Sequence, residues 1–341
     1  MELLAIDGSH LEGGGQIVRT AVALSAITGQ GVRIFNIRKG REKPGLKPQH
    51  LEGIKAAVRM CHAEHEGLSS NSMEVVFVPG KIEGGAQTID TKTAGAITLV
   101  LQTIVPIALY AESPVRLIVR GGTAVPFSPT IEYFERVVGF YLRRAGLPIS
   151  LETRKHGFYP AGGGEVLVRI EPGALHGIDL VERGALQKIE VLAIASGHLR
   201  GSRVAERLLD GFRKSFPGAH MKYHYVDADS PGCFIAGYAE FEHCRLGASN
   251  LGQRGVPAQN IGQEAGNELR QAIDGAGVVD SWMVDQLIPY LALAAASTKN
   301  PSRLRIPELS QHARTNMWVI QQFLPVQFDN RDNVLTCSLK T

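Results

Sequence analysis

Residues 12–40 read EGGGQIVRTAVALSAITGQGVRIFNIRKG, in which a glycine-rich turn leads into an apolar stretch of helical length and then a short strand. The same order recurs twice. Residues 84–122 contain the apolar stretch 94–111 and the strand VRLIVRGG, and residues 279–310 contain the apolar stretch 282–296 and the strand LRIPELS. A plan that recurs along a chain indicates an internal repeat. The sequence therefore predicts three copies of one α/β unit.

Each unit continues in the same way, with a second helix and then strands. The second helices are expected at residues 50–61, 129–145 and 312–324, where apolar residues recur at helical spacing. Alternating segments such as MEVVFV, ISLETR, GEVLVRI and VQFDNRDNVLTCSLK then predict strands. The motif EGGGQ at 12–16 is echoed by EGGAQ at 83–87. We therefore predict an α/β (α+β) fold of three repeated two-helix, four-strand-type units, with sheets outside and helices inside.

Extra chain separates the second unit from the third. Its expected elements, in chain order, are a strand at 189–195, a helix at 203–216, strands at 221–226 and 233–242, and a helix at 260–273. A run of this size makes a small α/β domain of its own, so it is interpreted as an insertion into the repeat. We predict a large domain made of residues 1–184 and 277–341, and an inserted small domain made of residues 185–276.

Composition places the chain among globular proteins. Of 341 residues, 44% are hydrophobic and 20% are charged, which excludes disordered, collagen-like and coiled-coil classes. The four cysteines form no CxxC motif and the first residues carry no signal-peptide pattern, so we expect a reduced, cytoplasmic protein. The stretch 94–111 contains Thr98 and Pro106, whereas about 20 apolar residues are needed to span a bilayer. We interpret it as a buried helix and expect no membrane segment.

Positive charge is concentrated in one segment. The net charge of the whole chain is +3, but residues 33–47 contain six Lys or Arg residues and one acid, Glu42, and so carry +5. A basic stretch in a near-neutral chain is typical of a site for a polyanion. A solvated basic loop is the alternative.

The glycine-rich turn at 13–15 is a candidate anion site. A turn of this kind that feeds a helix presents backbone N–H groups and the positive end of the helix dipole to an anion. Next to it, Glu12 could hold a magnesium ion and Arg19 could grip a phosphate. A purely structural tight turn is an equal alternative. The second glycine run, at 162–164 in HGFYPAGGGEV, is interpreted as a hairpin turn.

Gln102 and Asp285 occupy matching places in two repeats, four residues before Pro106 and Pro289. A proline inside a helix lacks the N–H that would bond the carbonyl four residues earlier. The two freed carbonyls, and the two polar side chains, need partners if they are buried. A nucleotide base or ribose is one candidate partner, and an internal hydrogen bond is the other.

His312 is the candidate nucleophile. It opens the second helix of the third repeat in SQHARTN, and the first repeat has Gln49 and His50 at the corresponding point. Symmetric repeats would bring both pairs, the basic segment and the glycine-rich turn to one cleft. A neutral imidazole in such a cleft could attack a phosphorus atom. A helix-capping or core role is the alternative.

Together these motifs resemble one family. EGGGQIVRT, RKGREKPGLKPQHLEG, GAITLVLQTIVP, RGGT, HGFYPAGGGEV and SQHARTN are similar to the RNA 3′-terminal phosphate cyclases, from residue 7 to about residue 328. The resemblance implies three α/β repeats with an inserted domain. It also implies an ATP-dependent, ligase-like nucleotidyl transfer in three steps. AMP is first attached to a histidine and then passes to the 3′-phosphate of an RNA end. The neighbouring 2′-hydroxyl finally closes a 2′,3′-cyclic phosphate.

The resemblance also implies roles for particular residues. His312 would be the adenylylated nucleophile, and Glu12 would hold a divalent metal, Mg or Mn. The ATP-binding residues would be Gln102, Trp282, Met283, Val284, Asp285 and Gln286. The residues facing phosphates or RNA would be Arg19, Arg38, Arg41 and Gln49. RNA 3′-phosphate ends would be the partners, while protein partners stay open, with a homodimer as one option.

Three other interpretations remain. The first is a non-catalytic relative of the cyclases that acts in RNA processing and lacks the active histidine, against which the presence of His312 speaks. The second is an enolpyruvyl transferase, which contains six related repeats where three are found here. The third is a basic scaffold that binds RNA without consuming ATP. A label transferred from ATP to the protein would separate the cyclase from the other three.

Overall fold

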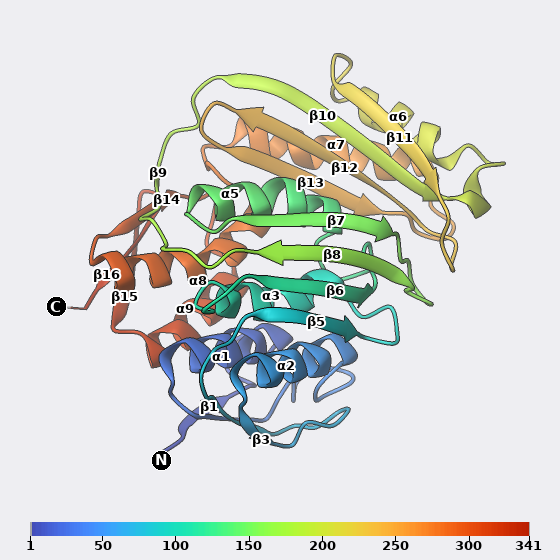
Figure 1. The fold of residues 1–341 in the computed structure, drawn as a ribbon. Coiled ribbons are helices and arrows are strands. Elements are labelled where there is room, and N and C mark those ends of the chain that lie inside the picture. Colours follow the sequence, from blue (N-terminus) through green and yellow to red (C-terminus); the bar gives the residue numbers. More distant parts are fainter. Residues whose placement is uncertain (1, 341) are drawn as a thin grey trace.

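The computed structural model describes residues 2–340, and its first repeat forms a small four-stranded sheet with two helices (Figure 1). The elements are β1 (Leu4–Asp7), α1 (Gly15–Thr28), β2 (Val32–Phe35), α2 (Pro48–Cys61), β3 (Glu64–Glu66) and β4 (Val75–Val78). The strand order is β1-β2-β4-β3. β1 and β2 are parallel, whereas β4 is antiparallel to both of its neighbours.

The second and third repeats have the same topology. The second contains β5 (Gly85–Asp90), α3 (Ile97–Ala108), β6 (Val115–Gly121), α4 (Ile131–Tyr133), the π-helical turn η1 (Phe134–Val138), α5 (Gly139–Arg144), β7 (Ile149–Lys155) and β8 (Gly164–Ile170). The third contains β9 (Asp179–Leu180), α8 (Ser281–Thr298), β14 (Ser302–Arg305), α9 (Gln311–Phe323), β15 (Val326–Arg331) and β16 (Val334–Leu339). Their strand orders, β5-β6-β8-β7 and β9-β14-β16-β15, repeat the pattern of one parallel and two antiparallel pairs. The predicted three-repeat α/β fold is confirmed.

Each repeat contains an opening strand that the sequence pattern does not predict, and in the first and third repeats this strand lies before the predicted start. The opening strands β1, β5 and β9 precede the glycine turn and the first helix. One consequence corrects the proposed echo between residues 12–16 and 83–87. EGGGQ leads into helix α1, whereas EGGAQ leads into strand β5, so the two motifs are not equivalent positions of the repeat. The loop of the second repeat that corresponds to EGGGQ is the one between β5 and α3.

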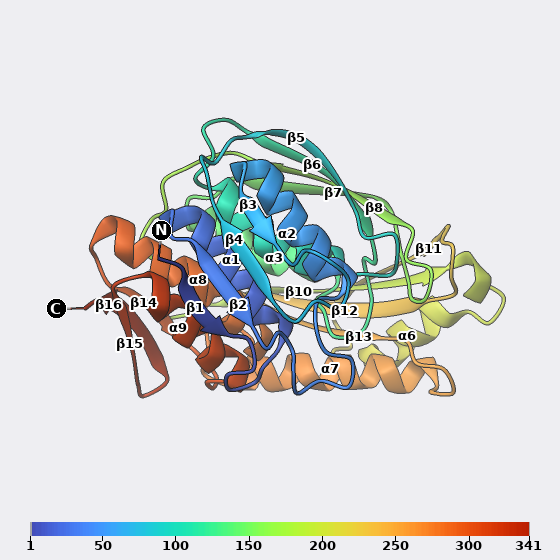
Figure 2. The same ribbon diagram turned by 90° about the horizontal axis from the view of Figure 1, so that it is seen from below.

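The helices lie inside the three sheets. α1 packs against α3 and α9, α2 packs against α3, and α8 packs against α9. Figure 2 shows the first sheet in front of α1 and α2, with the β5–β8 sheet and the β14–β16 sheet on two further sides. Ten of the twelve residues of α3 are buried, as expected for a helix that is hydrophobic all round. In residues 2–340 no helix combines the length and the apolarity that a membrane crossing needs.

The extra chain forms a fourth sheet with two helices of its own. Its elements are β10 (Leu186–Ser196), the 3₁₀ turn η2 (Gly197–Leu199), α6 (Val204–Arg213), β11 (His220–Val226), β12 (Cys233–Phe241), β13 (Arg245–Leu251) and α7 (Ala258–Asp274). The strand order is β11-β10-β12-β13, and α6 and α7 pack together on the sheet. This unit is inserted between β9 and α8, inside the third repeat. The exact domain limits stay a prediction of the sequence.

One buried carboxylate connects the inserted sheet to α8. Asp280 caps the start of α8, where its Oδ1 accepts hydrogen bonds from Met283 N at 3.0 Å and from the Tyr133 hydroxyl at 2.6 Å. Its Oδ2 accepts from the Gly247 backbone N–H on β13 at 2.9 Å. Burial raises the pKa of Asp280, while these donors oppose the rise. The inserted sheet, helix α4 and the start of α8 therefore share one hydrogen-bonded junction.

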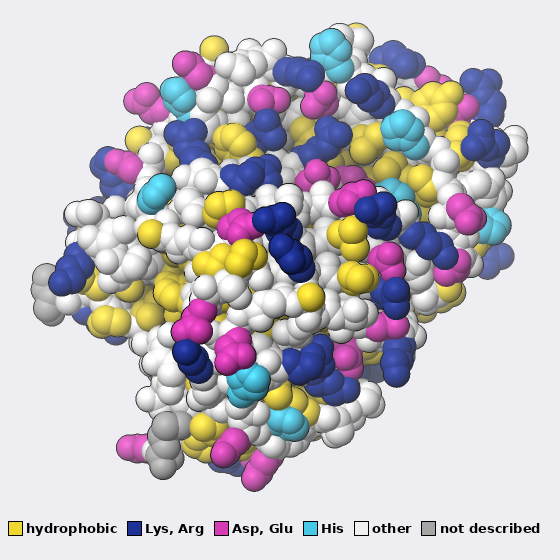
Figure 3. Space-filling view, viewed as in Figure 1, with side chains coloured by type: hydrophobic (Ala, Val, Ile, Leu, Met, Phe, Trp, Pro, Cys, Tyr) yellow, Lys and Arg dark blue, Asp and Glu magenta, His cyan; other side chains and the backbone are white. Residues whose placement is uncertain are grey.

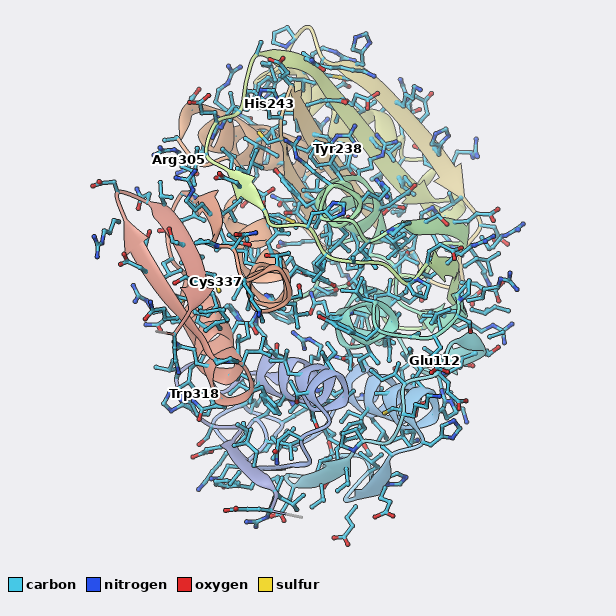
Figure 4. The ribbon with its side chains drawn as sticks, turned by 60° about the vertical axis from the view of Figure 1, so that its left-hand side comes forward. Glu112, Tyr238, His243, Arg305, Trp318 and Cys337 are labelled. Carbon is cyan, nitrogen blue, oxygen red and sulfur yellow. The ribbon has the colours of Figure 1, made fainter. Side chains whose placement is uncertain are left out.

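A second buried cluster lies at the same interface. Glu132 in α4 and His156 after β7 are 3.5 Å apart between Oε1 and Nδ1. Glu132 Oε2, His156 Nδ1 and the hydroxyl of Tyr238, which is labelled in Figure 4, have no hydrogen-bond partner in the described chain. Burial raises the pKa of Glu132 to about 8 and lowers the pKa of His156 to about 4. Near neutral pH the two side chains are therefore both uncharged.

We predict that Glu132 makes the fold less stable as the pH rises from about 6.5 to 8. Over this interval the carboxyl is protonated in the folded state and ionised in the unfolded state, so stability falls by up to about 1.4 kcal/mol per pH unit. Below about pH 6.5 His156, protonated only when unfolded, contributes the opposite slope. Glu132→Gln should flatten the fall in urea titrations between pH 6.5 and 8. The exposed Glu152→Gln is the control, and an unchanged slope in Glu132→Gln contradicts the prediction.

Candidate active site

The loop between β1 and α1 carries Glu12 and depends on its glycines. Gly13 has a φ of 61°, in the left-handed region that favours glycine. At Gly15 a Cβ atom would run into the imidazole of His50. The loop therefore passes directly over the start of α2. This close approach brings the Glu12 side chain toward residues of the first and third repeats.

His312 lies at the second position of α9, after the N-cap Ser310, whose hydroxyl accepts from Ala313 N at 2.9 Å. The Nδ1 atom of His312 is 3.0 Å from Gln16 Oε1 and 3.1 Å from Glu12 Oε2. An amide oxygen and a carboxylate both favour a proton on Nδ1, which leaves the lone pair on Nε2. The His312 side chain is 49% exposed, so a ligand can reach the ring.

Glu12 is held between two cationic or potentially cationic groups. Its Oε1 forms an ion pair with Arg41, from the basic loop after β2. Its Oε2 faces His312 without a hydrogen bond of acceptable geometry in the described chain. The side chain is 15% exposed, so little solvent screens its charge. A positive charge that developed on the His312 ring would be stabilised by this carboxylate.

Contacts on both sides of Glu12 attach its loop to α9. The rings of His10 and Trp318 stack with centroids 4.0 Å apart, and Figure 4 shows Trp318 where α9 meets the first repeat. The Glu12 backbone N–H points to the Thr315 hydroxyl at 3.4 Å. On α1, the Thr20 hydroxyl donates to Asn316 Oδ1 at 2.6 Å. These contacts fix the separation between Glu12 and the His312 ring.

A cationic pocket lies beneath the loop, around His50. Arg19 is partly buried, its buried Nε has no partner in the described chain, and burial lowers its pKa to about 10. Its Nη1 is 3.4 Å from His50 Nε2, while Lys47 N donates to His50 Nδ1 at 3.2 Å. A neutral imidazole has one N–H and one lone pair, so it cannot accept both bonds. An anion that accepted from Arg19 and from the imidazole would satisfy both groups.

The pKa shifts around His50 show that repulsion between cations is part of this pocket. Burial, followed by Arg19, Arg38 and Lys47, lowers the pKa of His50 well below its usual value. Burial, followed by Arg38 and Lys43, lowers the pKa of Lys47. Arg38 donates from Nη1 to the backbone oxygens of Lys43 and Gly45 at 2.7 and 2.9 Å. Positive groups held together against repulsion favour a multiply charged anion such as a phosphate.

The outer surface of the second sheet has a different charge pattern. The face in Figure 3 shows Lys and Arg side chains interspersed with Asp and Glu. Arg120 pairs with Glu165 at 2.8 Å, and Arg169 pairs with Glu171 at 2.6 Å. Exposed pairs of this kind contribute little to binding or stability. The unpaired charge of Arg19 is therefore the stronger indication of an anion site.

The polar residues of α3 and α8 meet across the helix interface. Gln102 Nε2 donates to Gln286 Oε1 at 2.7 Å. Asp285 Oδ1 accepts from the Ser310 hydroxyl at 2.8 Å, and its backbone oxygen accepts from Asn316 Nδ2 at 3.1 Å. The carbonyl freed by the proline of α8 therefore has an internal partner. Burial raises the pKa of Asp285, and the Ser310 hydroxyl and the charge of His312 oppose the rise.

The structure brings most of the predicted site residues together, although it does not test their roles. Glu12, Arg41 and His312 are in contact, and Asp285 joins them through Ser310. Arg19 and Arg38 lie beside His50, and Gln49 is half-buried at the start of α2. Gln102 is hydrogen-bonded to Gln286. At the start of α8, Trp282 is 64% exposed, whereas the side chains of Met283 and Val284 are buried in the core. Side-chain contact with a nucleotide is thus open to Trp282 but not to the two core residues.

Sequence reasoning missed three groups that touch the site. Gln16 ends the EGGGQ motif, so its position was visible even though its role was not. Lys47 lay within the basic segment, whereas no pattern pointed to Trp318. The comparison between repeats was also one residue out of step. His312 is the second residue after its N-cap and corresponds to Gln49, whereas His50 is the third.

The donor set allows a limited role for a divalent cation. Within residues 2–340, no three His, Cys, Asp or Glu side chains gather as a metal cage. Glu12 offers one carboxylate, with Oε2 free of hydrogen bonds in the described chain. Magnesium is commonly held by one or two carboxylates, with substrate phosphates and waters supplying the other oxygens. Glu12 fits a cation that arrives with a phosphate ligand.

Comparison with known proteins gives a consistent result. A family model described as RNA 3′-terminal phosphate cyclase matches residues 10–330. Curated proteins named RNA 3′-terminal phosphate cyclase are similar over nearly the whole chain. The Methanosarcina barkeri protein is 42% identical over 96% of both chains, and the Nitrosospira multiformis protein is 40% identical over 95% of this chain and 92% of its own. The Pyrococcus furiosus protein is 37% identical over 97% of this chain and 96% of its own.

A solved structure of another protein is much less similar. The alignment with the enolpyruvyl transferase NikO from Streptomyces tendae covers 100% of this chain and 52% of the NikO chain. Its TM-score is 0.28 and the sequence identity is 12%. Similarity at that level carries no argument about fold or function. The family model and the curated relatives span the three repeats and the insertion alike. On this ground the chain belongs to the RNA 3′-terminal phosphate cyclase family.

Proposed function

We propose that this chain converts an RNA 3′-terminal phosphate to a 2′,3′-cyclic phosphate in an ATP-dependent reaction, with His312 as the nucleophile. The observation that carries the proposal is the setting of the His312 ring. Gln16 and Glu12 face Nδ1, which leaves Nε2 for reaction, and the cationic pocket around His50 lies beneath the same loop. A nucleophile and a phosphate pocket in one place are what nucleotidyl transfer requires.

In the first step Nε2 of His312 attacks the α-phosphorus of ATP. A P–N bond forms, the P–O bond to the β-phosphate breaks, and pyrophosphate leaves. The proton on Nδ1 stays in place, so the ring carries a positive charge next to the Glu12 carboxylate. The negative charge of the carboxylate stabilises the adenylylated ring. The positive charge of the ring makes the imidazole a good leaving group for the next step.

In the second step an oxygen of the RNA 3′-phosphate attacks the phosphorus of the bound AMP. A P–O–P linkage forms, the P–N bond breaks, and His312 returns to its neutral form with the proton still on Nδ1. In the third step the adjacent 2′-hydroxyl attacks the activated 3′-phosphorus. The cyclic phosphate forms, AMP leaves, and the hydroxyl proton is lost to solvent or to the departing AMP. Because this attack is intramolecular, proximity supplies much of its rate.

The remaining site residues position phosphates. Arg19, Arg38 and Lys47 supply positive charge around His50, and the start of α1 offers backbone N–H groups at the glycine turn. A divalent cation, Mg or Mn, would neutralise phosphate charge when it is bound, with Glu12 as its protein ligand. Arg41 holds the Glu12 carboxylate in place. ATP in this scheme lies along Trp282 to Gln286 and Gln102.

A non-catalytic RNA-binding relative is the second candidate. The site around His312 disfavours it, because an RNA-binding scaffold needs neither an oriented imidazole nor a partly buried carboxylate beside it. Transfer of label from ATP to the protein decides between the two candidates. A cytoplasmic location and a homodimer stay predictions of the sequence.

We predict that His312→Ala abolishes attachment of AMP to the protein. The reason is that the variant lacks the Nε2 lone pair, while loss of a half-exposed side chain leaves the fold intact. The measurement is acid-labile label and intact mass after incubation with α-labelled ATP and magnesium or manganese. His62→Ala, at the far end of α2, should label like the wild-type protein. Covalent AMP on His312→Ala would remove the assignment of the nucleophile.

We predict that Arg19→Met lowers kcat/KM for AMP attachment about 10- to 100-fold, which corresponds to about 1.5–3 kcal/mol for a lost charge-assisted phosphate contact. Without nucleotide its melting temperature should not fall, because the substitution removes a partly buried charge that has no acidic partner. Arg33→Met, which disrupts an exposed ion pair with Glu74, is the control. A variant that melts earlier but labels normally would show that Arg19 serves the fold alone.

We predict that an RNA with a 2′-deoxy terminal sugar accepts AMP and then stops, because no hydroxyl is present to close the ring. The adenylylated end should accumulate, and an RNA that ends in a 3′-hydroxyl should not react. The measurement follows a labelled terminal phosphate through resistance to phosphatase and release by pyrophosphate cleavage. Release of AMP from the deoxy substrate at the ribose rate would refute the cyclisation step.

A further inference from the structure

Phe127 is the most exposed large hydrophobic side chain in residues 2–340. Its relative exposure is 100%, compared with 67% for Tyr159 and 64% for Trp282. It also has a φ of 63°, in the left-handed region that bulky residues rarely adopt. An aromatic side chain held fully in solvent on a strained backbone contributes no packing to the fold. A strained backbone of this kind is typical of functional sites.

The loop that carries Phe127 is held firmly on both sides. It connects β6 to α4, and Val125 before it and Thr130 after it are buried. The Ser128 hydroxyl donates to Val125 O at 2.9 Å, and the Thr98 hydroxyl on α3 donates to Pro129 O at 3.0 Å. These bonds fix the backbone on each side of the ring. The ring therefore projects from a rigid base, which lowers the entropy cost of binding.

Contacts along α3 and α8 place this loop beside the proposed nucleotide site. Thr98 lies one helical turn before Gln102, and Trp282 lies one turn before Gln286. The Tyr133 hydroxyl in α4, directly after the loop, donates to the N-cap Asp280 of α8 at 2.6 Å, so the loop and Trp282 lie at the same end of the helix pair. The contact from Thr98 goes to the residue two positions after Phe127.

The repeat topology supports the same placement. The loop of Phe127 follows the second strand of its repeat, as the basic loop with Arg41 does in the first repeat and the loop ending in Ser310 does in the third. Arg41 contacts Glu12, and Ser310 contacts Asp285. Two of the three equivalent loops thus contribute to the site. The equivalent loop of the second repeat carries the exposed Phe127.

We propose that the Phe127 ring stacks on a nucleobase of the RNA at or next to its 3′ end. The proposal rests on the proposed function, in which an RNA end reaches His312. Bases of a single strand are free to stack, and aromatic side chains are the usual platforms for them. Phe has no hydrogen-bonding group, so the platform accepts any base. An enzyme that acts on ends of different sequence needs this kind of contact.

The adenine of ATP is the competing source of the base. In the proposed function ATP lies along Trp282 to Gln286, which already offers an exposed indole. Phe127 is exposed over its whole surface, which suits a ligand that extends out of the site along a chain. The test therefore measures RNA binding and AMP attachment separately.

The experiment compares Phe127→Ala, Phe127→Tyr and Phe127→Gly in the full-length chain. RNA affinity is measured by fluorescence anisotropy with a short single-stranded RNA 3′-phosphate in the absence of ATP. AMP attachment is measured without RNA. We expect Phe127→Ala to weaken RNA binding roughly tenfold, the scale of one lost base–aromatic stack. Phe127→Tyr, which keeps the ring, should stay within about twofold of the wild-type protein, and neither variant should change AMP attachment.

Two further measurements identify the contact. An RNA with an abasic terminal or penultimate nucleotide should bind the wild-type protein about as weakly as Phe127→Ala binds intact RNA. The abasic RNA and Phe127→Ala combined should weaken binding little more than either change alone. Tyr110→Ala, at the opposite end of α3, is the control and should bind RNA normally. Phe127→Gly relieves the left-handed strain, so its melting temperature should be equal or higher while its RNA binding falls.

Several outcomes would overturn the proposal. Normal RNA binding by Phe127→Ala would show that no base stacks on the ring. Equal loss in Phe127→Ala and Phe127→Tyr would exclude stacking as the cause, and an early-melting Phe127→Gly would indicate a structural role. Loss of AMP attachment in Phe127→Ala would assign the ring to ATP. Failure of the wild-type protein to attach AMP would refute the proposed function, while the anisotropy arm would still decide on Phe127.

Discussion

The carboxylate of Glu12 is the contact on which the site depends. It joins a loop of the first repeat to Arg41 on one side and to His312 of the third repeat on the other. Neither repeat holds both the carboxylate and the histidine, so the pair exists only when the helices of the two repeats pack together. The stack of His10 on Trp318 and the link from Thr20 to Asn316 serve that packing. The first and third repeats therefore contribute to this contact jointly, and neither could form it alone.

The cationic pocket shows how the fold accommodates an unfavourable group. Arg19 is partly buried with an unpaired Nε, and burial, followed by the charge of Arg38, lowers its pKa. The rest of the molecule must stabilise this arrangement, because a lone buried charge is costly. Surface pairs such as Arg120 with Glu165 carry no such cost. In the proposed function these positive groups are already in place when a phosphate binds, which is the condition under which electrostatic catalysis is most effective.

Much of the fold could be predicted because even short segments show the hydrophobic periodicity of a helix or a strand. The apolar run of α3 and the alternation in β8 identified their elements directly. Two of the opening strands were missed for different reasons. β9 has only two residues, and β5 overlaps the EGGAQ motif that was interpreted as a glycine-rich turn. Within the site, Glu12 and His312 stood out by residue type, and the family resemblance gave them roles. The stack of His10 on Trp318 could not be predicted, since it joins the two ends of the chain.

The short strand β9 has a consequence for how this chain is made. It belongs to the third sheet, where Asp179 pairs with Arg303 at 2.7 Å, yet the whole inserted unit lies between the two residues along the chain. During synthesis the first two repeats and the insertion can fold as they emerge from the ribosome. β9 cannot pair until β14 has been synthesised. Pairings this distant in sequence form slowly. His312 in α9 also follows the insertion along the chain, so its contact with Glu12 can form only after the inserted unit has been synthesised.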